Sequence, residues 1–283
     1  MIGRLLAMAA ALGLSSTAAL AAPRQPTGKW VINFADAQCI ASRNYGSEQD
    51  PLYLVLKAPA VGDILQLGIV RKGARSIATQ ADGEIVYNGT SSFGASLLEY
   101  GAKGQRALLA KIPAREFKWL RTATMIQIRA KSAGYTTTAS RMPVGGGGGA
   151  NETFAVTQMQ SVLKLLNDCT ADLRKVWHVW SGEGSSPDLK DGARGNLTNL
   201  FKADDYPDIA LYKEQMGTVA LVLLVDEQGK VADCTVVETT GVASLDAQAC
   251  AIVKERATFA PATGLDGKPA KSSFRQKITW RME

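Results

Sequence analysis

The hydrophobic pattern is clearest near the C-terminal end of the chain. Gly217–Val225 is an almost continuous run of Val, Leu and Ala bounded by turn residues, which predicts a strand covered on both faces. Asp226–Gly229 has the composition of a hairpin turn with a left-handed glycine. Val231–Thr239 is therefore expected to return as the second strand of a β-hairpin.

A helix and a further strand are expected after the hairpin. Ser244 is predicted to cap the helix, with Asp246 in its first turn. Its apolar stripe has helical spacing: Leu245, Ala249, Ile252 and Val253. Pro261 cannot continue the helix, because proline lacks an amide hydrogen. From Ser272 to Met282 large or apolar residues alternate with polar ones, which predicts a strand with one buried face and one wet face.

The resulting order of strand, strand, helix and strand is a small α+β unit. Residues typical of turns, strand ends and the core mark its course. These landmarks are Tyr206, Pro207, Gly217, Asp226, Gly229, Gly241, Leu245, Asp246, Phe259, Pro261, Gly267 and Pro269. In this order, over about residues 203–283, the unit closely resembles the C-terminal domain of the TonB family. The resemblance implies a β-β-α-β fold and a protein-binding role in the periplasm. It covers little more than a quarter of the chain, so it does not imply that the chain is the energy transducer itself.

The region from residue 28 to 180 has many short strand candidates separated by turn residues. They are Trp30–Phe34, Tyr53–Lys57, Ile64–Val70, Glu84–Tyr87, Leu108–Ile112 and Met125–Arg129. This spacing predicts an antiparallel β-rich domain of the sandwich or barrel type. A short helix is expected at Ala114–Leu120, and a helical stripe predicts a closing helix at Val156–Trp177. The layout weakly resembles the invasion-associated locus B family, whose periplasmic domains also begin with Trp and an early Cys.

Residues 1–21 have the pattern of a cleavable signal peptide. Arg4 supplies the positive charge, an Ala- and Leu-rich run follows, and Ala19-Leu20-Ala21 fits the cleavage site. Export would place the mature protein in the periplasm of a Gram-negative bacterium. The alternative is a retained inner-membrane anchor, although the apolar run is short for a bilayer.

Residues 181–202 are predicted to be a linker between two domains, because they are rich in Gly, Ser and Asp. A transducing TonB resembles a three-part chain with a membrane helix, a long Pro-rich spacer and the C-terminal domain. No Pro-rich spacer is found here. An accessory or structural envelope protein is therefore an alternative to a transducer.

The four cysteines of an exported protein predict two disulfides. Cys234 lies on a predicted strand and Cys250 on the helix that must pack on it, so these two are expected to pair. Cys39 and Cys169 remain, near the two ends of the preceding region, where a bond would clamp that region shut. Buried free thiols are the alternative.

Charge and residue type disfavour most other functions. Residues 28–180 hold 18 Lys plus Arg against 11 Asp plus Glu, whereas residues 181–283 hold 12 against 15. The basic excess could give weak contact with an anionic envelope surface, or it could be an ordinary solvated face. The spacings of the cysteines do not match those of zinc ligands, and the only histidine, His178, is isolated. No nucleophile motif is present. No enzyme activity, metal, cofactor or nucleic-acid partner is expected.

The last strand is the predicted partner-binding element. At the end of a three-stranded unit it is expected to be an edge strand, whose unpaired backbone groups can template an added strand. The TonB resemblance implies the same mode, with an extended segment of an outer-membrane receptor as partner. Arg275, Lys277, Thr279 and Arg281 are the predicted contact residues. The three cationic side chains could instead protect the edge from aggregation.

Overall fold

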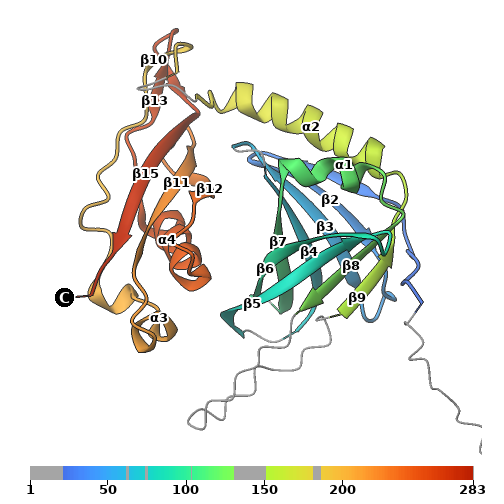
Figure 1. The fold of residues 1–283 in the computed structure, drawn as a ribbon. Helices are drawn as coiled ribbons and strands as arrows, with labels where there is room; N and C mark the ends of the chain where they lie inside the picture. The colour runs from blue at the N-terminus through green and yellow to red at the C-terminus, as the bar shows by residue number, and fades with distance from the viewer. Residues whose placement is uncertain are drawn as a thin grey trace, which may run out of the picture.

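The computed structural model describes residues 22–61, 64–73, 76–102, 104–130, 151–180 and 186–282. The predicted signal peptide and residues 181–185 of the predicted linker lie outside these residues. The chain is α+β, as predicted: a large curled antiparallel sheet with few helices, then a smaller sheet-and-helix unit (Figure 1).

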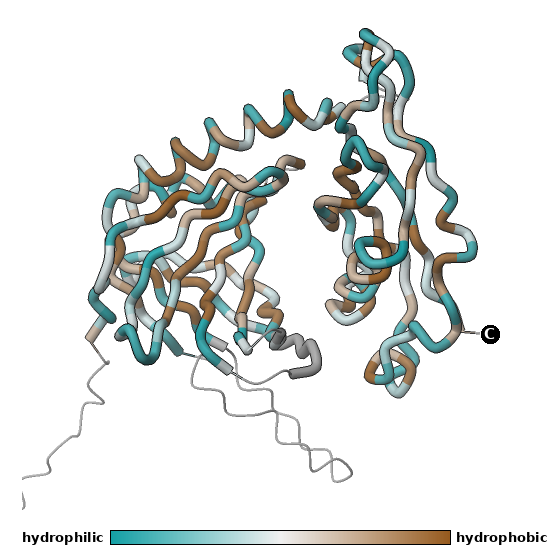
Figure 2. The backbone as a smooth tube through the Cα atoms, turned by 180° about the vertical axis from the view of Figure 1, so that it is seen from behind, coloured by the Kyte–Doolittle hydropathy of each residue, from teal (hydrophilic) through white to brown (hydrophobic). Residues whose placement is uncertain are grey.

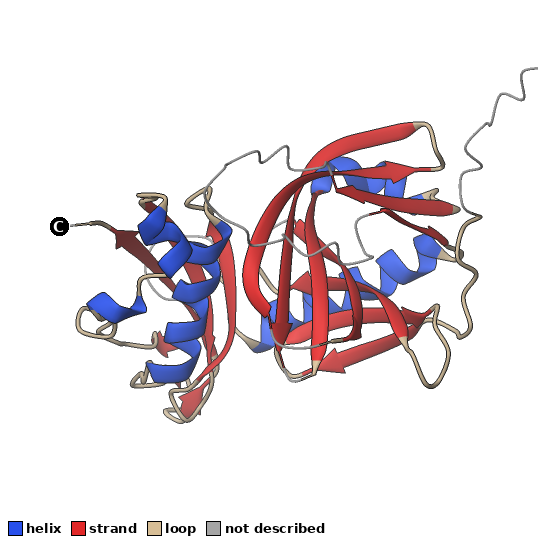
Figure 3. Cartoon of the chain, turned by 90° about the horizontal axis from the view of Figure 1, so that it is seen from below, coloured by secondary structure: helices blue, strands red, loops and turns tan. Residues whose placement is uncertain are grey.

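The first nine strands form one antiparallel sheet in the order β1-β2-β3-β4-β7-β6-β5-β8-β9. Their bounds are Val31–Ala35, Gln38–Asn44, Leu52–Pro59, Ile64–Lys72, Ser76–Tyr87, Ser91–Ala102, Gln105–Pro113, Met125–Ala130 and Asn151–Ala155 for β1 to β9. The sheet curls strongly on itself into a half-barrel, which is plainest from below (Figure 3). The prediction of an antiparallel β-rich domain is therefore confirmed.

Alternation along the central strands fills the half-barrel with apolar side chains. In β3, Leu52, Leu54 and Leu56 are buried while their neighbours are half-buried, and β4 continues the pattern with Leu67 and Ile69. Figure 2 shows the hydrophobic stretches along these strands. Burial of this kind contributes about 25 cal/mol per Å² of apolar area, so the filled interior is the main source of stability of this domain.

Two helical segments cover one end of the half-barrel. The helix α2 (Met159–Val176) buries one stripe of its surface, as its spacing predicts, and the predicted closing helix is confirmed. A short turn η1 (Ala114–Glu116) leads into α1 (Phe117–Arg121), whose Leu120 is fully buried. Cys39 of β2 and Cys169 of α2 form a disulfide, which holds the helix on the sheet.

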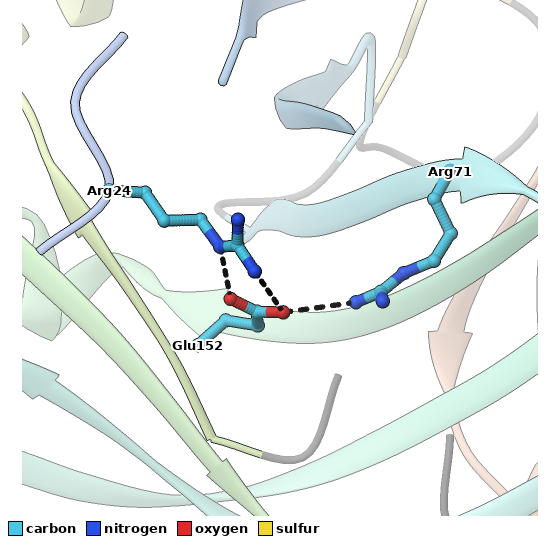
Figure 4. A network of polar contacts seen from close by, with 3 residues as sticks. All are labelled: Arg24, Arg71 and Glu152. Carbon is cyan, nitrogen blue, oxygen red and sulfur yellow. Dashed lines mark hydrogen bonds and ion pairs between the residues drawn. The ribbon is translucent and has the colours of Figure 1, made fainter. Parts of the chain in front are cut away.

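The N-terminal segment crosses the seam between the two ends of the curled sheet. Arg24 exchanges two backbone hydrogen bonds with β9, and the amide of Thr27 donates to the carbonyl of Asn44 on β2. The Arg24 guanidinium also contacts the Glu152 carboxylate at 2.5 Å, and Arg71 of β4 reaches the same carboxylate at 3.4 Å (Figure 4). One buried glutamate thus ties the seam segment, β9 and β4 together.

Replacing Glu152 with glutamine should destabilise the half-barrel. The variant keeps the side-chain shape but removes the charge that two arginines share, and hydrogen bonds to a charged group are each worth about 1.5–3 kcal/mol. We expect a loss of about 2 kcal/mol in the free energy of unfolding, measured with urea. Glu84→Gln is the matched control, because the Glu84–Arg129 pair is half-exposed and is expected to contribute under about 1 kcal/mol. Equal losses in the two variants would contradict a special role for Glu152.

The C-terminal unit is a three-stranded antiparallel sheet with one helix. Its strands are β11 (Gly217–Val225), β12 (Val231–Glu238) and β15 (Ser272–Trp280), in the order β12-β11-β15, and its helix is α4 (Ala243–Arg256). The remaining short elements are β10 (Leu189–Asp191), η2 (Ala203–Asp205), α3 (Asp208–Tyr212), β13 (Ala262–Gly264) and β14 (Pro269–Ala270). The predicted β-β-α-β order is confirmed, and Cys234 of β12 bonds Cys250 of α4 as predicted.

The predicted cap of α4 is wrong. The helix begins at Ala243, its N-cap position is Val242, and no side chain caps it there. The first turn is held instead by Asp246, whose carboxylate accepts hydrogen bonds from the amide and hydroxyl of Thr240. Ser244 lies inside the helix, so its hydroxyl cannot serve as the N-cap.

The C-terminal sheet packs on both faces. On β11, Val219, Leu221, Leu223 and Val225 belong to the core beneath α4. Val222 and Leu224 point to the other face and join the core of the half-barrel. The end of α2 also reaches β15, where the Ser273 hydroxyl donates to the carbonyl of His178 at 3.5 Å. The C-terminal unit is therefore docked on the first domain, and the domain limits of 28–180, 181–202 and 203–283 stay a prediction.

Candidate functional site: the free edge of the C-terminal sheet

The strand β15 has a partner on one side only. It pairs with β11 along its whole length, from Ser272 opposite Val225 to Trp280 opposite Gly217. No other strand of the described chain joins it in this sheet. The prediction of an edge strand at this position is therefore confirmed for the part of the chain that the structure describes.

Two observations indicate which backbone groups of β15 face the open edge. The Thr279 and Thr218 hydroxyls lie 2.9 Å apart across the pair, which fits the closer, non-hydrogen-bonded class of antiparallel pairs. The Lys277 carbonyl accepts a hydrogen bond from the Gln276 side chain at 2.7 Å. Since alternate residues turn their backbone groups to the same side, the amides and carbonyls of Lys277 and Thr279 both point away from β11.

The predicted contact side chains lie on the sheet face that is opposite α4. Arg275, Lys277 and Thr279 are exposed, while their neighbours on the α4 face are at least partly buried. Lys277 forms a solvent-exposed ion pair with Glu238 at 3.5 Å, and Arg275 reaches the carbonyl of Trp180 at 3.5 Å. Arg281 lies beyond the end of the strand and is also exposed. Their use in partner contact stays a prediction.

A hollow of about 350 Å³ lies beside the last part of β15. One side is formed by Gln276–Trp280, and the other by Gly195–Thr198 with Phe201. Figure 1 shows the chain after β10 running down alongside β15. This chain lies in the region that the sequence suggested as a linker.

The segment beside β15 is fixed to the C-terminal unit near both ends. Arg194 exchanges two backbone hydrogen bonds with Ala260, at 3.0 and 2.8 Å. Phe201 packs edge-on against Trp280 with ring centroids 5.6 Å apart. Between them, Leu197 is buried in the core beneath α4. Although its composition resembles a linker, the segment from Arg194 to Phe201 is therefore packed against the C-terminal unit.

An aromatic cluster closes the end of the hollow. Trp280 packs between Phe201 and Tyr206, and the Tyr206 hydroxyl donates to the carbonyl of Gln215 at 2.6 Å. Burial raises the pKa of the Tyr206 hydroxyl above its usual range. Trp280 is 5% exposed, and its indole Nε1 has no hydrogen-bond partner within the described ranges. A buried donor of this kind normally has a partner.

The remaining landmark residues build the scaffold behind this edge. Asp226 accepts hydrogen bonds from the amides of Gln228 and Lys230, which shapes the β11–β12 turn. Gly229 in that turn has φ of 74°, and an added Cβ would strike the backbone of Phe259. Gly241 and Gly267 also have positive φ, Leu245 and Phe259 are buried in the core beneath α4, and Pro207, Pro261 and Pro269 lie at or just before the short helix α3 and the strands β13 and β14.

Metal binding finds no support among these groups. In the part of the chain that the structure describes, no set of three or more His, Cys, Asp or Glu side chains is arranged to hold a metal ion. The edge of β15 offers backbone hydrogen-bonding groups and exposed cations, which are groups that recognise a peptide.

Comparison with known proteins agrees with this geometry. Residues 202–282 match the family model described as the Gram-negative bacterial TonB protein C-terminal domain. No curated protein and no solved structure matches the chain. The match spans the three-stranded sheet, α4, and Tyr206 and Trp280 of the aromatic cluster, so the chain carries at residues 202–282 a C-terminal domain of the TonB family.

Proposed function

We propose that this protein binds an extended segment of a partner protein by adding it as a fourth strand beside β15. The observation that carries the proposal is the outward direction of the Lys277 and Thr279 backbone groups, which face a hollow instead of another strand. An edge of this kind gives affinity through main-chain hydrogen bonds and specificity through alternate side chains. Proteins of the TonB family are associated with the bacterial envelope, and this supports a partner in the same compartment.

The partner class we propose is the periplasm-facing segment of an outer-membrane receptor. Arg275 and Lys277 place two exposed cations along one face of the edge, and Arg281 adds a third just beyond the end of the strand. Complementary charge favours a partner with acidic side chains at alternate positions. A periplasmic location, after removal of residues 1–21, is part of this proposal. No helix among the described residues is both long and apolar enough to span a membrane.

A second candidate is an accessory envelope module that does not transduce energy. One observation favours it: Val222 and Leu224 of the C-terminal sheet are buried in the core of the half-barrel. A domain docked in this way has a fixed orientation relative to the first domain. A transducer needs a spacer that carries its C-terminal domain across the periplasm. A fixed orientation instead suits an accessory module that presents its binding edge in one direction.

The test uses the exported, disulfide-bonded protein and overlapping twelve-residue peptides covering the periplasm-facing N-terminal segments of the outer-membrane receptors of the same bacterium. At least one peptide should bind in a fluorescence anisotropy titration. Thr279→Pro removes an outward amide and should weaken that binding at least about tenfold, which is about 1.4 kcal/mol. Circular dichroism should show that the variant is still folded.

Two variants control for effects on the fold. Thr279→Val keeps the amide and loses only the hydroxyl that contacts Thr218, so peptide binding should be retained. Ile278→Pro removes an amide that points to β11 and should lower the melting temperature of the domain. Failure of every peptide to bind, or unchanged affinity in folded Thr279→Pro, would overturn strand addition at β15.

A further inference from the structure

The hollow beside β15 has a built second side. Strand addition needs only an open edge, yet Gly195–Thr198 stands opposite Gln276–Thr279 across a space of about 350 Å³. The two sides approach without a backbone hydrogen bond between them in the described ranges. The backbone groups of β15 at this place consequently face a space that neither side fills.

We propose that Gly195–Thr198 is the second wall of a peptide slot, which receives one extended segment of about four residues between itself and β15. This inference rests on the proposed strand addition and adds the second contact surface. Four residues of strand span about 13 Å, and Gln276–Thr279 is the matching length of β15. The peptide would pair with β15 along one edge and meet the wall along the other.

The wall is held in place before any peptide arrives. The Arg194–Ala260 backbone bonds fix it at one end. An added Cβ on Gly195 would collide with the Phe259 ring, so the backbone lies directly on that ring. Leu197 is buried, and the carbonyl of Leu200 accepts a hydrogen bond from Arg256. A preformed slot costs less ordering on binding than a loose segment that closes over the ligand.

The groups around the slot define the chemistry of the occupant. Asn196 and Thr198 are exposed polar residues that can meet the far edge of an added strand. On the opposite face of the sheet from α4, the exposed cations Arg275 and Lys277 favour an acidic side chain, although Lys277 already pairs with Glu238 at 3.5 Å. The slot thus fits an extended peptide that carries an acidic residue.

The wall also determines how many strands can be added. A strand added to an ordinary edge presents a new edge of its own, which can bind a further strand. Here the wall would cover that new edge, so one peptide should fill the site. We expect one peptide per protein and no higher assembly at saturation.

The test replaces a residue of the wall with a larger one. Thr198 is exposed and lines the hollow, so Thr198→Trp should fill the slot and weaken binding of the tightest-binding receptor peptide at least tenfold. Asn199→Trp is the matched control, because Asn199 is exposed, adjacent and outside the lining of the hollow. Its affinity should stay within twofold of the unmodified protein. Circular dichroism and the melting temperature check that both variants are folded.

The outcomes separate this inference from strand addition itself. Loss of binding in Thr198→Trp with retention in Asn199→Trp supports the slot. Binding that is lost in Thr279→Pro but unchanged in folded Thr198→Trp would overturn the slot and leave strand addition standing. Hydrogen exchange provides a second measurement. The amides of residues 195–198 should gain protection when the peptide binds. Protection confined to β15 would count against a second wall.

Discussion

Replacing Cys39 and Cys169 together with alanine should lower the free energy of unfolding by about 5 kcal/mol. The bond joins residues 130 positions apart, and the chain-entropy model gives a loss of about this size for so long a loop. Both cysteines are buried, and they connect β2 of the curled sheet to the covering helix α2. Without the bond, the unfolded chain gains freedom while the folded contacts stay nearly the same.

The second disulfide supplies the matched comparison for this result. Cys234 and Cys250 are 16 positions apart, so the same model gives only about 3 kcal/mol for the Cys234→Ala, Cys250→Ala variant. Urea unfolding of both variants at 25 °C, followed by circular dichroism, measures the two losses. A larger loss from the short loop than from the long one would show that local packing, and not loop closure, determines the contribution of these bonds.

Most elements of the C-terminal unit could be predicted because local pattern and burial agree there. Val219–Val225 is apolar throughout, and the structure buries it between α4 and the half-barrel. The sequence pattern does not predict three strands of the first domain: β2, β6 and β9. The strand β6 contains serine and glycine in place of the β-branched residues that mark a strand. Its pairing with β5 and β7 comes from tertiary context.

The candidate site could be predicted only on the β15 side. Alternation from Ser272 onwards identifies an edge strand with exposed cations. The segment Gly195–Thr198 has the composition of a linker, and its position depends on Phe259, against which Gly195 packs, and on the core that buries Leu197, both distant in sequence. Periodicity carries no information about such contacts, because an irregular segment has no repeating face. The large apolar residues of this stretch are Leu197, Leu200 and Phe201, and they are its local signals of burial.

An ionic cluster at the junction of the two domains could not be predicted from the sequence either. Asp233 of β12 is 2% exposed and accepts a hydrogen bond from Gln38 of β2 at 2.7 Å. Lys57 of β3 lies 3.8 Å from the carboxylate, and Lys254 of α4 lies 3.9 Å away. The pKa of Lys57 is lowered, chiefly by burial and further by Lys254, while Asp233 opposes the shift. The cluster thus contains charges that are costly to separate.

Asp233→Ala should destabilise the protein by about 3 kcal/mol, because it leaves the partly buried Lys57 ammonium without its nearest counter-ion. Adding Lys57→Met should recover most of the loss, since an apolar replacement of both charges is close to neutral. Adding Lys254→Met is the matched control and should recover less, because the Lys254 side chain is 43% exposed against 23% for Lys57. The double-mutant cycle, measured by urea unfolding, gives the coupling energies.

The pH dependence of stability provides an independent check on Lys57. Its folded-state pKa lies below its unfolded value of 10.5, so between these two values the unfolded chain holds more protons. In that window stability gains from rising pH, and below it the full cost of the buried charge is present. Asp233→Ala removes the group that opposes the shift, so the window should widen to lower pH. Lys57→Met should abolish this gain in both backgrounds. An unchanged pH profile in Lys57→Met would show that the partly buried ammonium does not lower the free energy of unfolding.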